Sequence, residues 1–134
     1  MKYLSLVLIL TISIFTACQN ASISETALAK NEIKQVSVKE TNEVVSKGNV
    51  QFIDVRTVEE YADKHAPKAV NLPLDSIVKE LAKFDKDKPV YLICQSGARS
   101  QKAAEILQKA EFKEIYNVKG GTSEWISAGL PTEK

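Results

Sequence analysis

The sequence predicts an α/β domain in which a small parallel sheet is flanked by helices on both faces. Two observations lead to this prediction. From about Val36 onward, short apolar runs alternate with amphipathic stretches, as they do when each strand is followed by a helix. The length of 134 residues also suits a single domain.

The expected strands are short, and the most apolar of them should lie at the centre of the sheet. That strand is the run PVYLI, from Pro89 to Ile93. In chain order, the strands are expected at residues 36–38, 51–55, 69–71, 89–93 and 114–118.

Local signals mark the helix boundaries. Thr57 can cap a helix whose first turn holds Glu59 and Glu60, and Gly48 can end the helix before it. Apolar residues recur at helical spacing in the later segments, and Trp125 is expected to join the core. The helices are expected at residues 39–46, 57–64, 75–84, 100–110 and 122–128.

Composition excludes several classes of function. The chain has 18 Lys and Arg residues against 17 Asp and Glu residues, so nothing indicates a polybasic surface for nucleic acid. The two cysteines, Cys18 and Cys94, cannot form a disulfide framework. Together with the single histidine, His65, they cannot supply the roughly four ligands of a zinc site. We therefore expect no metal and no cofactor.

Residues 1–17 have the layout of a secretory signal peptide. Lys2 gives a basic start, the stretch from Tyr3 to Phe15 is almost wholly apolar, and small residues follow it. The apolar run is shorter than the ~20 residues that a membrane span needs. An uncleaved membrane anchor is the alternative interpretation.

The segment Phe15-Thr16-Ala17-Cys18 resembles the bacterial lipobox. The resemblance implies cleavage before Cys18 and lipidation of that cysteine, and an ordinary signal peptide is the alternative. Residues 18–34 are mostly polar and are expected to form a flexible tether ahead of the domain, which is expected at residues 35–134. The alternative is that they form a first helix of that domain. We expect an exported protein of the bacterial cell envelope, either periplasmic or anchored in the membrane as a lipoprotein.

The chemistry is expected at Cys94, directly after the central strand. The loop CQSGARS, from Cys94 to Ser100, joins that strand to a helix. Small residues and the permissive Gly97 let the backbone curl, so that several N–H groups point at one place beside the positive end of the helix. With Arg99 nearby, this environment favours the Cys94 thiolate and an anionic substrate. The alternative is a buried, inert thiol.

Five segments, in order, resemble one known family. They are FIDVR with Glu60-Tyr61, the stretch from His65 to Pro73, the strand VYLI, the loop CQSGARS, and YNVKGG ahead of Trp125. The loop resembles the active-site pattern Cys-x-x-Gly-x-Arg of rhodaneses, and the other four resemble further segments of that family. The resemblance covers about residues 36 to 130 and implies a rhodanese-like domain.

The resemblance implies a two-step sulfur transfer. Cys94 would take the outer sulfur of a donor such as thiosulfate, become a persulfide, and pass the sulfur to cyanide or a thiol. The remaining loop residues would bind the substrate; they are Gln95, Ser96, Gly97, Ala98, Arg99 and Ser100. Many family members have arginine where this chain has Gln95, a departure that puts tight thiosulfate binding in doubt. We expect the protein to be a monomer.

Polar residues outside the loop admit two interpretations. Asp54, Arg56 and Glu60 could form a catalytic cluster, but we favour a polar network that fixes strand and helix ends and supports the site. His65 could act as a base, but its segment is far from the loop in the chain, so a structural or surface role is favoured.

Two other functions remain open from the sequence. A Cdc25-like phosphatase or arsenate reductase shares the fold, but such loops resemble Cys-x5-Arg, whereas Cys94 and Arg99 stand in the shorter Cys-x4-Arg spacing. The second alternative is not an enzyme but a tethered module that carries a persulfide or docks a partner.

Overall fold

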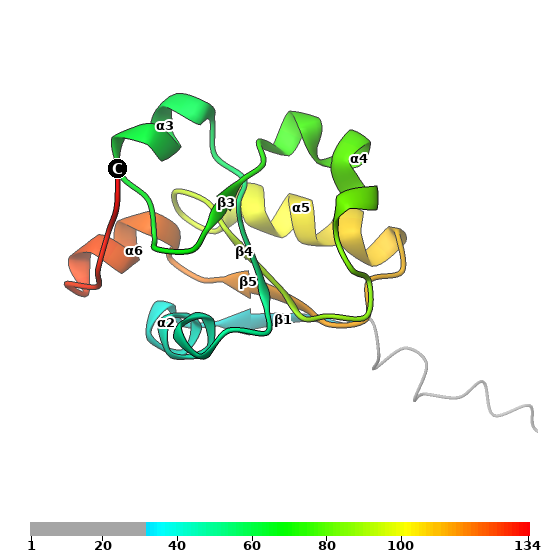
Figure 1. Cartoon of the computed structure of the whole chain (residues 1–134), viewed down its shortest axis with the longest axis horizontal. Coiled ribbons are helices and arrows are strands. Elements are labelled where there is room, and N and C mark those ends of the chain that lie inside the picture. Colours follow the sequence, from blue (N-terminus) through cyan, green and yellow to red (C-terminus); the bar gives the residue numbers. More distant parts are fainter. Residues whose placement is uncertain (1–31) are drawn as a thin grey trace, which may run out of the picture.

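The structure, a computed structural model, describes residues 32–134. A five-stranded, wholly parallel sheet forms its centre, with the strands in the order β1-β5-β4-β2-β3. Helices α2 (Val38–Lys47) and α6 (Gly121–Ser127) cover one face of the sheet, and α4 (Ile77–Glu80) and α5 (Ala98–Lys109) cover the other (Figure 1). The predicted fold class, a small parallel sheet with helices on both faces, is confirmed.

The strands are β1 (Ile33–Val36), β2 (Gln51–Asp54), β3 (Val70–Asn71), β4 (Val90–Ile93) and β5 (Ile115–Val118). All four residues of β4 are buried, and this strand lies between β5 and β2. The prediction that the run before Cys94 is the central strand is confirmed. Its burial on both faces explains why it is apolar throughout.

The first strand differs from its prediction. It begins at Ile33, inside the segment expected to be a tether, and it ends before Val38, which starts α2 instead. As one of the two edge strands, β1 exposes Lys34 and Gln35, so no continuous apolar run marks it in the sequence. Ser37 and Glu40 form a capping box that starts the helix at Val38.

The helices largely follow their predictions. Thr57 caps α3 (Val58–Asp63) in a capping box with Glu60. The stretch expected to be one helix at 75–84 is broken into α4 and two 3-10 turns, Leu74–Ser76 and Leu81–Lys83. Ile77, Leu81 and Phe84 nevertheless pack against the core on one face of the sheet, which explains their helical spacing in the sequence.

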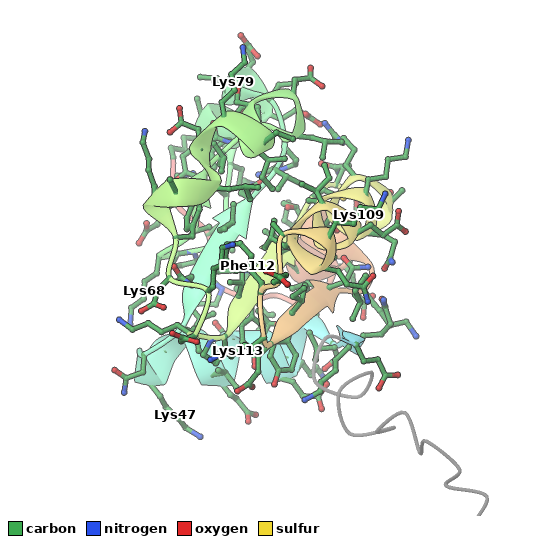
Figure 2. The ribbon with its side chains drawn as sticks, turned by 90° about the vertical axis from the view of Figure 1, so that its right-hand side faces the viewer. Lys47, Lys68, Lys79, Lys109, Phe112 and Lys113 are labelled. Atoms are coloured by element: carbon green, nitrogen blue, oxygen red, sulfur yellow. The ribbon has the colours of Figure 1, made fainter. Side chains whose placement is uncertain are left out.

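Two apolar layers hold the sheet between the helices. On the α5 face, Phe112 is fully buried, and Figure 2 shows it pointing inward while Lys47, Lys79 and Lys109 point away from the body of the molecule. On the α2 face, Trp125 is buried and its ring lies 5.9 Å from that of Phe52, as a core residue should. The predicted core role of Trp125 is confirmed.

His65 has a structural position. Its ring is buried and stacks on Tyr61 with 3.7 Å between the ring centroids, and its Nδ1 lies 2.9 Å from the Tyr61 carbonyl oxygen. Its backbone pairs with Glu133 in the C-terminal segment. The ring is thus engaged in packing the segment after α3.

The predictions for the signal peptide, for Cys18 and for the tether up to residue 31 lie outside the described residues. Between residues 32 and 134, no helix is both long and apolar enough to cross a membrane.

Candidate active site

The parallel strands bring their carboxyl ends to one edge of the sheet, and Cys94 lies there. Cys94 directly follows β4, and only 1% of its surface is exposed. The chain then turns through Gly97, whose φ of +98° lies in the left-handed region, and α5 begins at Ala98. The helix starts two residues earlier than predicted, which places Arg99 and Ser100 in its first turn.

Uncharged hydrogen-bond donors surround the sulfur. The Gly97 N–H donates to Sγ at 3.1 Å and the Ser100 hydroxyl lies 3.4 Å from it, with the backbone N–H groups of Ser96 and Ser100 also contributing. These donors are termed the sulfur cradle below. Burial raises the pKa of the Cys94 thiol, but the cradle outweighs burial, and the pKa lies below its ordinary value. The site therefore favours the thiolate more than the surroundings of an ordinary cysteine do.

The start of α6 holds the backbone of Cys94 in place. The Cys94 carbonyl oxygen accepts hydrogen bonds from the backbone N–H of Thr122 at 2.8 Å and from its hydroxyl at 3.2 Å. The next carbonyl, that of Gln95, accepts from the backbone N–H of Ser123 at 3.1 Å. A Cβ on Gly121 would lie only 2.3 Å from the Cys94 carbonyl oxygen, so this close approach requires glycine.

Asn117 on β5 supports the loop from the other side. Its buried side-chain amide donates to the Gly97 carbonyl oxygen at 3.3 Å and to the side chains of Gln35 and Gln101 at 3.0 and 3.2 Å. Together with Ser96, Ala98 and Lys119, these residues line a shallow hollow of about 420 Å³ beside the loop. Asn117 thus holds the peptide group between Gly97 and Ala98, directly after the N–H group that donates to the sulfur.

Sequence reasoning assigned no role to Asn117, Gly121, Thr122 or Ser123. All four lie in or beside YNVKGG, which was noted only as part of a family resemblance. The signal that was available is the pair Gly120-Gly121 between a strand and a helix, because adjacent glycines there allow two backbones to approach closely.

Arg99 is engaged in a bidentate ion pair with Glu60 of α3. Both guanidinium nitrogens, Nη1 and Nη2, lie 2.7 Å from a carboxylate oxygen. Glu60 also accepts from the backbone N–H of Thr57 at 3.0 Å. The hydrogen bonds from Arg99 lower the pKa of Glu60 to about 2, and the same pair raises the pKa of Arg99. The cation expected to serve the loop is therefore balanced by an anion.

Asp54 and Arg56 form a second, fully buried pair. The guanidinium contacts both carboxylate oxygens, at 2.7 Å for the shortest contact, and donates to the Lys64 carbonyl at 2.8 Å. The Asn71 amide bridges the carbonyl oxygens of Asp54 and Arg56 at 3.1 and 3.0 Å. These bonds tie the ends of β2 and β3 to the segment after α3.

The remaining loop residues face outward. Gln95, Ser96 and Ala98 are exposed, and the Gln95 amide donates to the Ser123 hydroxyl at 2.7 Å. Across residues 32–134, no group of three or more His, Cys, Asp or Glu side chains is placed to hold a metal ion. The reactive group of the site is the Cys94 thiol, whose pKa is lowered by the neutral donors of the sulfur cradle.

Comparison with known proteins gives a consistent result. The family model described as Rhodanese-like domain matches residues 37–128. The chain is 36% identical over 92 residues to the thiosulfate sulfurtransferase GlpE of Coxiella burnetii, which covers 69% of this chain and 86% of that protein. It is 35% identical over 102 residues to YrkF of Bacillus subtilis, a candidate sulfur carrier protein, which covers 76% of this chain. The chain spans only 54% of the length of YrkF.

A solved structure agrees with the sequence relatives. The rhodanese-like domain protein of Staphylococcus aureus superposes with a TM-score of 0.63 at 35% identity, covering 69% of this chain and 91% of that one.

Proposed function

Because this chain belongs to the rhodanese-like family, we propose that it is a sulfurtransferase that carries sulfane sulfur on Cys94. The observation that supports the proposal most directly is the sulfur cradle. It lowers the pKa of a thiol that is 1% exposed, although burial alone would raise that pKa. Such a thiolate is a ready nucleophile, and the same donors suit the negative charge of a persulfide.

The proposed reaction has two steps. In the first, the Cys94 thiolate attacks the outer sulfur of a donor such as thiosulfate; a bond forms between the two sulfurs, the S–S bond of the donor breaks, and sulfite leaves with the electron pair. In the second, cyanide or a thiolate attacks the outer sulfur of the persulfide, and the Cys94 thiolate leaves. Charge balances in both steps with cyanide, so no separate general base is needed.

Initial-rate kinetics test this function. With thiosulfate and cyanide varied independently, we expect thiocyanate to form with the parallel double-reciprocal lines of a ping-pong reaction. Converging lines would contradict a free persulfide intermediate, and an absence of thiocyanate with hydrolysis of an aryl phosphate would replace the proposal with a phosphatase.

The similarity to YrkF favours one second candidate, a sulfur carrier. In that case the persulfide would form as above, but the sulfur would pass to a partner protein rather than to a small molecule. Stoichiometric persulfide formation from thiosulfate, followed by slow release to cyanide and to small thiols, would favour the carrier over the enzyme.

We also propose that a lipid on Cys18 anchors the protein in the bacterial cell envelope. The support is the sequence of residues 1–18. Because the sheet is parallel, Ile33 at the start of β1 lies at the edge opposite to the one where Cys94 follows β4. An anchor ahead of Ile33 would leave the sulfur cradle on the far side from the attachment point. Fractionation and the mass of the mature N-terminus together test the anchor. We expect Cys18→Ala to be soluble or left unprocessed. An unmodified N-terminus at or beyond Cys18, in a freely soluble wild-type protein, would contradict the anchor.

A further inference from the structure

The site has a positive side chain whose charge is already compensated. The Glu60 carboxylate and the Arg99 guanidinium face each other through two contacts of 2.7 Å, and the two side chains are 33% and 35% exposed. A donor arriving at the loop therefore meets a neutral pair rather than a free cation. The pair also lies within electrostatic reach of the sulfur, since the Cys94 thiolate contributes to the raised pKa of Arg99.

Two neighbouring positions do not supply the missing charge. Arg56 is buried and paired with Asp54, and the position after Cys94 holds the uncharged Gln95. Lys119 is exposed and lines the shallow hollow together with Asn117 and loop residues, whereas neither Glu60 nor Arg99 lines it. Each additional negative charge on a donor thus gains little attraction from Arg99 and is repelled by Glu60.

Resting on the proposed sulfurtransferase function, we propose that Glu60 determines donor specificity by neutralising Arg99. It selects sulfane-sulfur donors that carry one negative charge or none, such as organic thiosulfonates and persulfides, over the thiosulfate dianion. The same carboxylate that caps α3 would thereby set the charge preference of the site.

A pair of donors that share the same reacting group but differ in charge isolates this effect. Methanethiosulfonate and thiosulfate both present an outer sulfur bonded to an oxidised sulfur, but methanethiosulfonate has one negative charge and thiosulfate has two. In each case the Cys94 thiolate attacks the outer sulfur, the donor S–S bond breaks, and methanesulfinate or sulfite leaves with the electron pair. The resulting Cys94 persulfide is the same.

Glu60→Gln is a suitable variant because it changes charge with little change in shape. The amide oxygen can still accept from the Thr57 N–H, which preserves the capping box, and from one nitrogen of Arg99. The matched control is Glu59→Gln, which removes the same charge from the same helical turn at an exposed residue. The double variant Glu60→Gln with Arg99→Gln removes the cation that the single variant would free.

The measurement is the ratio of kcat/KM for thiosulfate to that for methanethiosulfonate, with cyanide as acceptor. We expect Glu60→Gln to raise this ratio about fivefold, mainly by lowering the KM for thiosulfate, and to make thiosulfate use more sensitive to salt. Glu59→Gln and the double variant should stay near the wild-type ratio. Lys119 is unchanged in all of these proteins, so its charge cancels from the comparison.

The outcomes separate the two proposals. If the wild-type protein forms no persulfide with either donor, both the sulfurtransferase function and the specificity proposal fail. If persulfide forms but Glu60→Gln leaves the donor ratio unchanged, or Glu59→Gln raises it equally, only the role of Glu60 is overturned. Far-ultraviolet circular dichroism and urea unfolding establish that the variant is folded.

Discussion

The inside of the active-site loop contains neutral hydrogen-bond donors, whereas its rim, formed by Glu60 and Arg99, contains two opposite charges. Inside, the sulfur cradle holds the Cys94 sulfur with neutral donors, the Gly97 N–H at 3.1 Å and the Ser100 hydroxyl at 3.4 Å. At the rim, two full charges, Glu60 and Arg99, cancel each other. If Glu60 sets the donor preference as proposed, the acidity of the thiol and the charge preference for the donor are set by different groups. A substitution in the cradle should therefore change the thiol pKa without changing the donor preference, and a substitution at the rim should do the reverse.

The largest effect is expected from distorting the inside of the loop through Gly121. In Gly121→Ala, the new Cβ would lie 2.3 Å from the Cys94 carbonyl oxygen, so the backbone that presents the sulfur must move. We expect the free energy of unfolding to fall by about 2–3 kcal/mol and sulfur transfer to fall by more than tenfold. Urea unfolding and thiosulfate:cyanide kinetics measure both.

Gly129→Ala is the matched control for that substitution. Gly129 also has a positive φ, +69°, but nothing lies within 4 Å of its would-be Cβ. The free energy of unfolding of Gly129→Ala should fall by only about 1 kcal/mol, the cost of a positive φ for a non-glycine residue, and the variant should retain full activity. Equal losses in the two variants would show that the contact with Cys94 is unimportant.

The next effect concerns the rim. Arg99→Ala would leave the Glu60 carboxylate without its partner, so a dianionic donor should be repelled and the KM for thiosulfate should rise about fivefold. Arg99→Lys should restore part of the loss, because an ammonium group lacks the planar fork that makes both contacts. The acid dissociation constant of the Cys94 thiol should change by a smaller factor than the KM for thiosulfate. Identical kinetics in all three proteins would mean that the rim takes no part in donor use.

A smaller effect is expected from removing one neutral donor of the cradle. Ser100→Ala deletes the hydroxyl beside Sγ, so the pKa of Cys94 should rise toward its ordinary value. Since a lowered thiol pKa keeps the thiolate populated to lower pH, the pH midpoint of alkylation by iodoacetamide should move upward in the variant. At neutral pH we expect alkylation to slow about threefold. The control Ser46→Ala, on the exposed face of α2, should leave the midpoint in place.

The smallest effect is expected at Gln95. Gln95→Arg adds a cation to the rim at an exposed position whose amide donates to the Ser123 hydroxyl. We expect the KM for thiosulfate to fall about twofold, with a steeper dependence on salt. An unchanged or higher KM would show that a positive charge at position 95 does not help thiosulfate to bind.

The parts of the site that could be predicted from the sequence are those that are local in the chain. A buried apolar run, a cysteine, a glycine and a helix start occur within a dozen or so residues, and local sterics and helix geometry suffice to fold them into a loop with inward N–H groups. The capping residue Thr57 was found for the same reason.

The parts that could not be predicted depend on strand order. Asn117 meets Gly97, and Thr122 meets Cys94, only because β5 lies beside β4 in the sheet. Glu60 and Arg99 were both singled out, but nothing in a one-dimensional pattern shows that residues 39 apart pair with each other. The edge strand β1 was misplaced because half of its side chains face solvent, which leaves too little apolar pattern to detect.

The central claim, that Cys94 carries the sulfur, is tested most directly by the intact mass of the domain after exposure to thiosulfate. We predict that the wild-type protein gains the mass of one sulfur atom, that peptide mapping places it on Cys94, and that cyanide removes it. Cys94→Ser, in which the described domain has no thiol left, should gain nothing. A sulfur adduct that persists in Cys94→Ser, or a wild-type protein that gains no sulfur from either thiosulfate or methanethiosulfonate, would contradict the account.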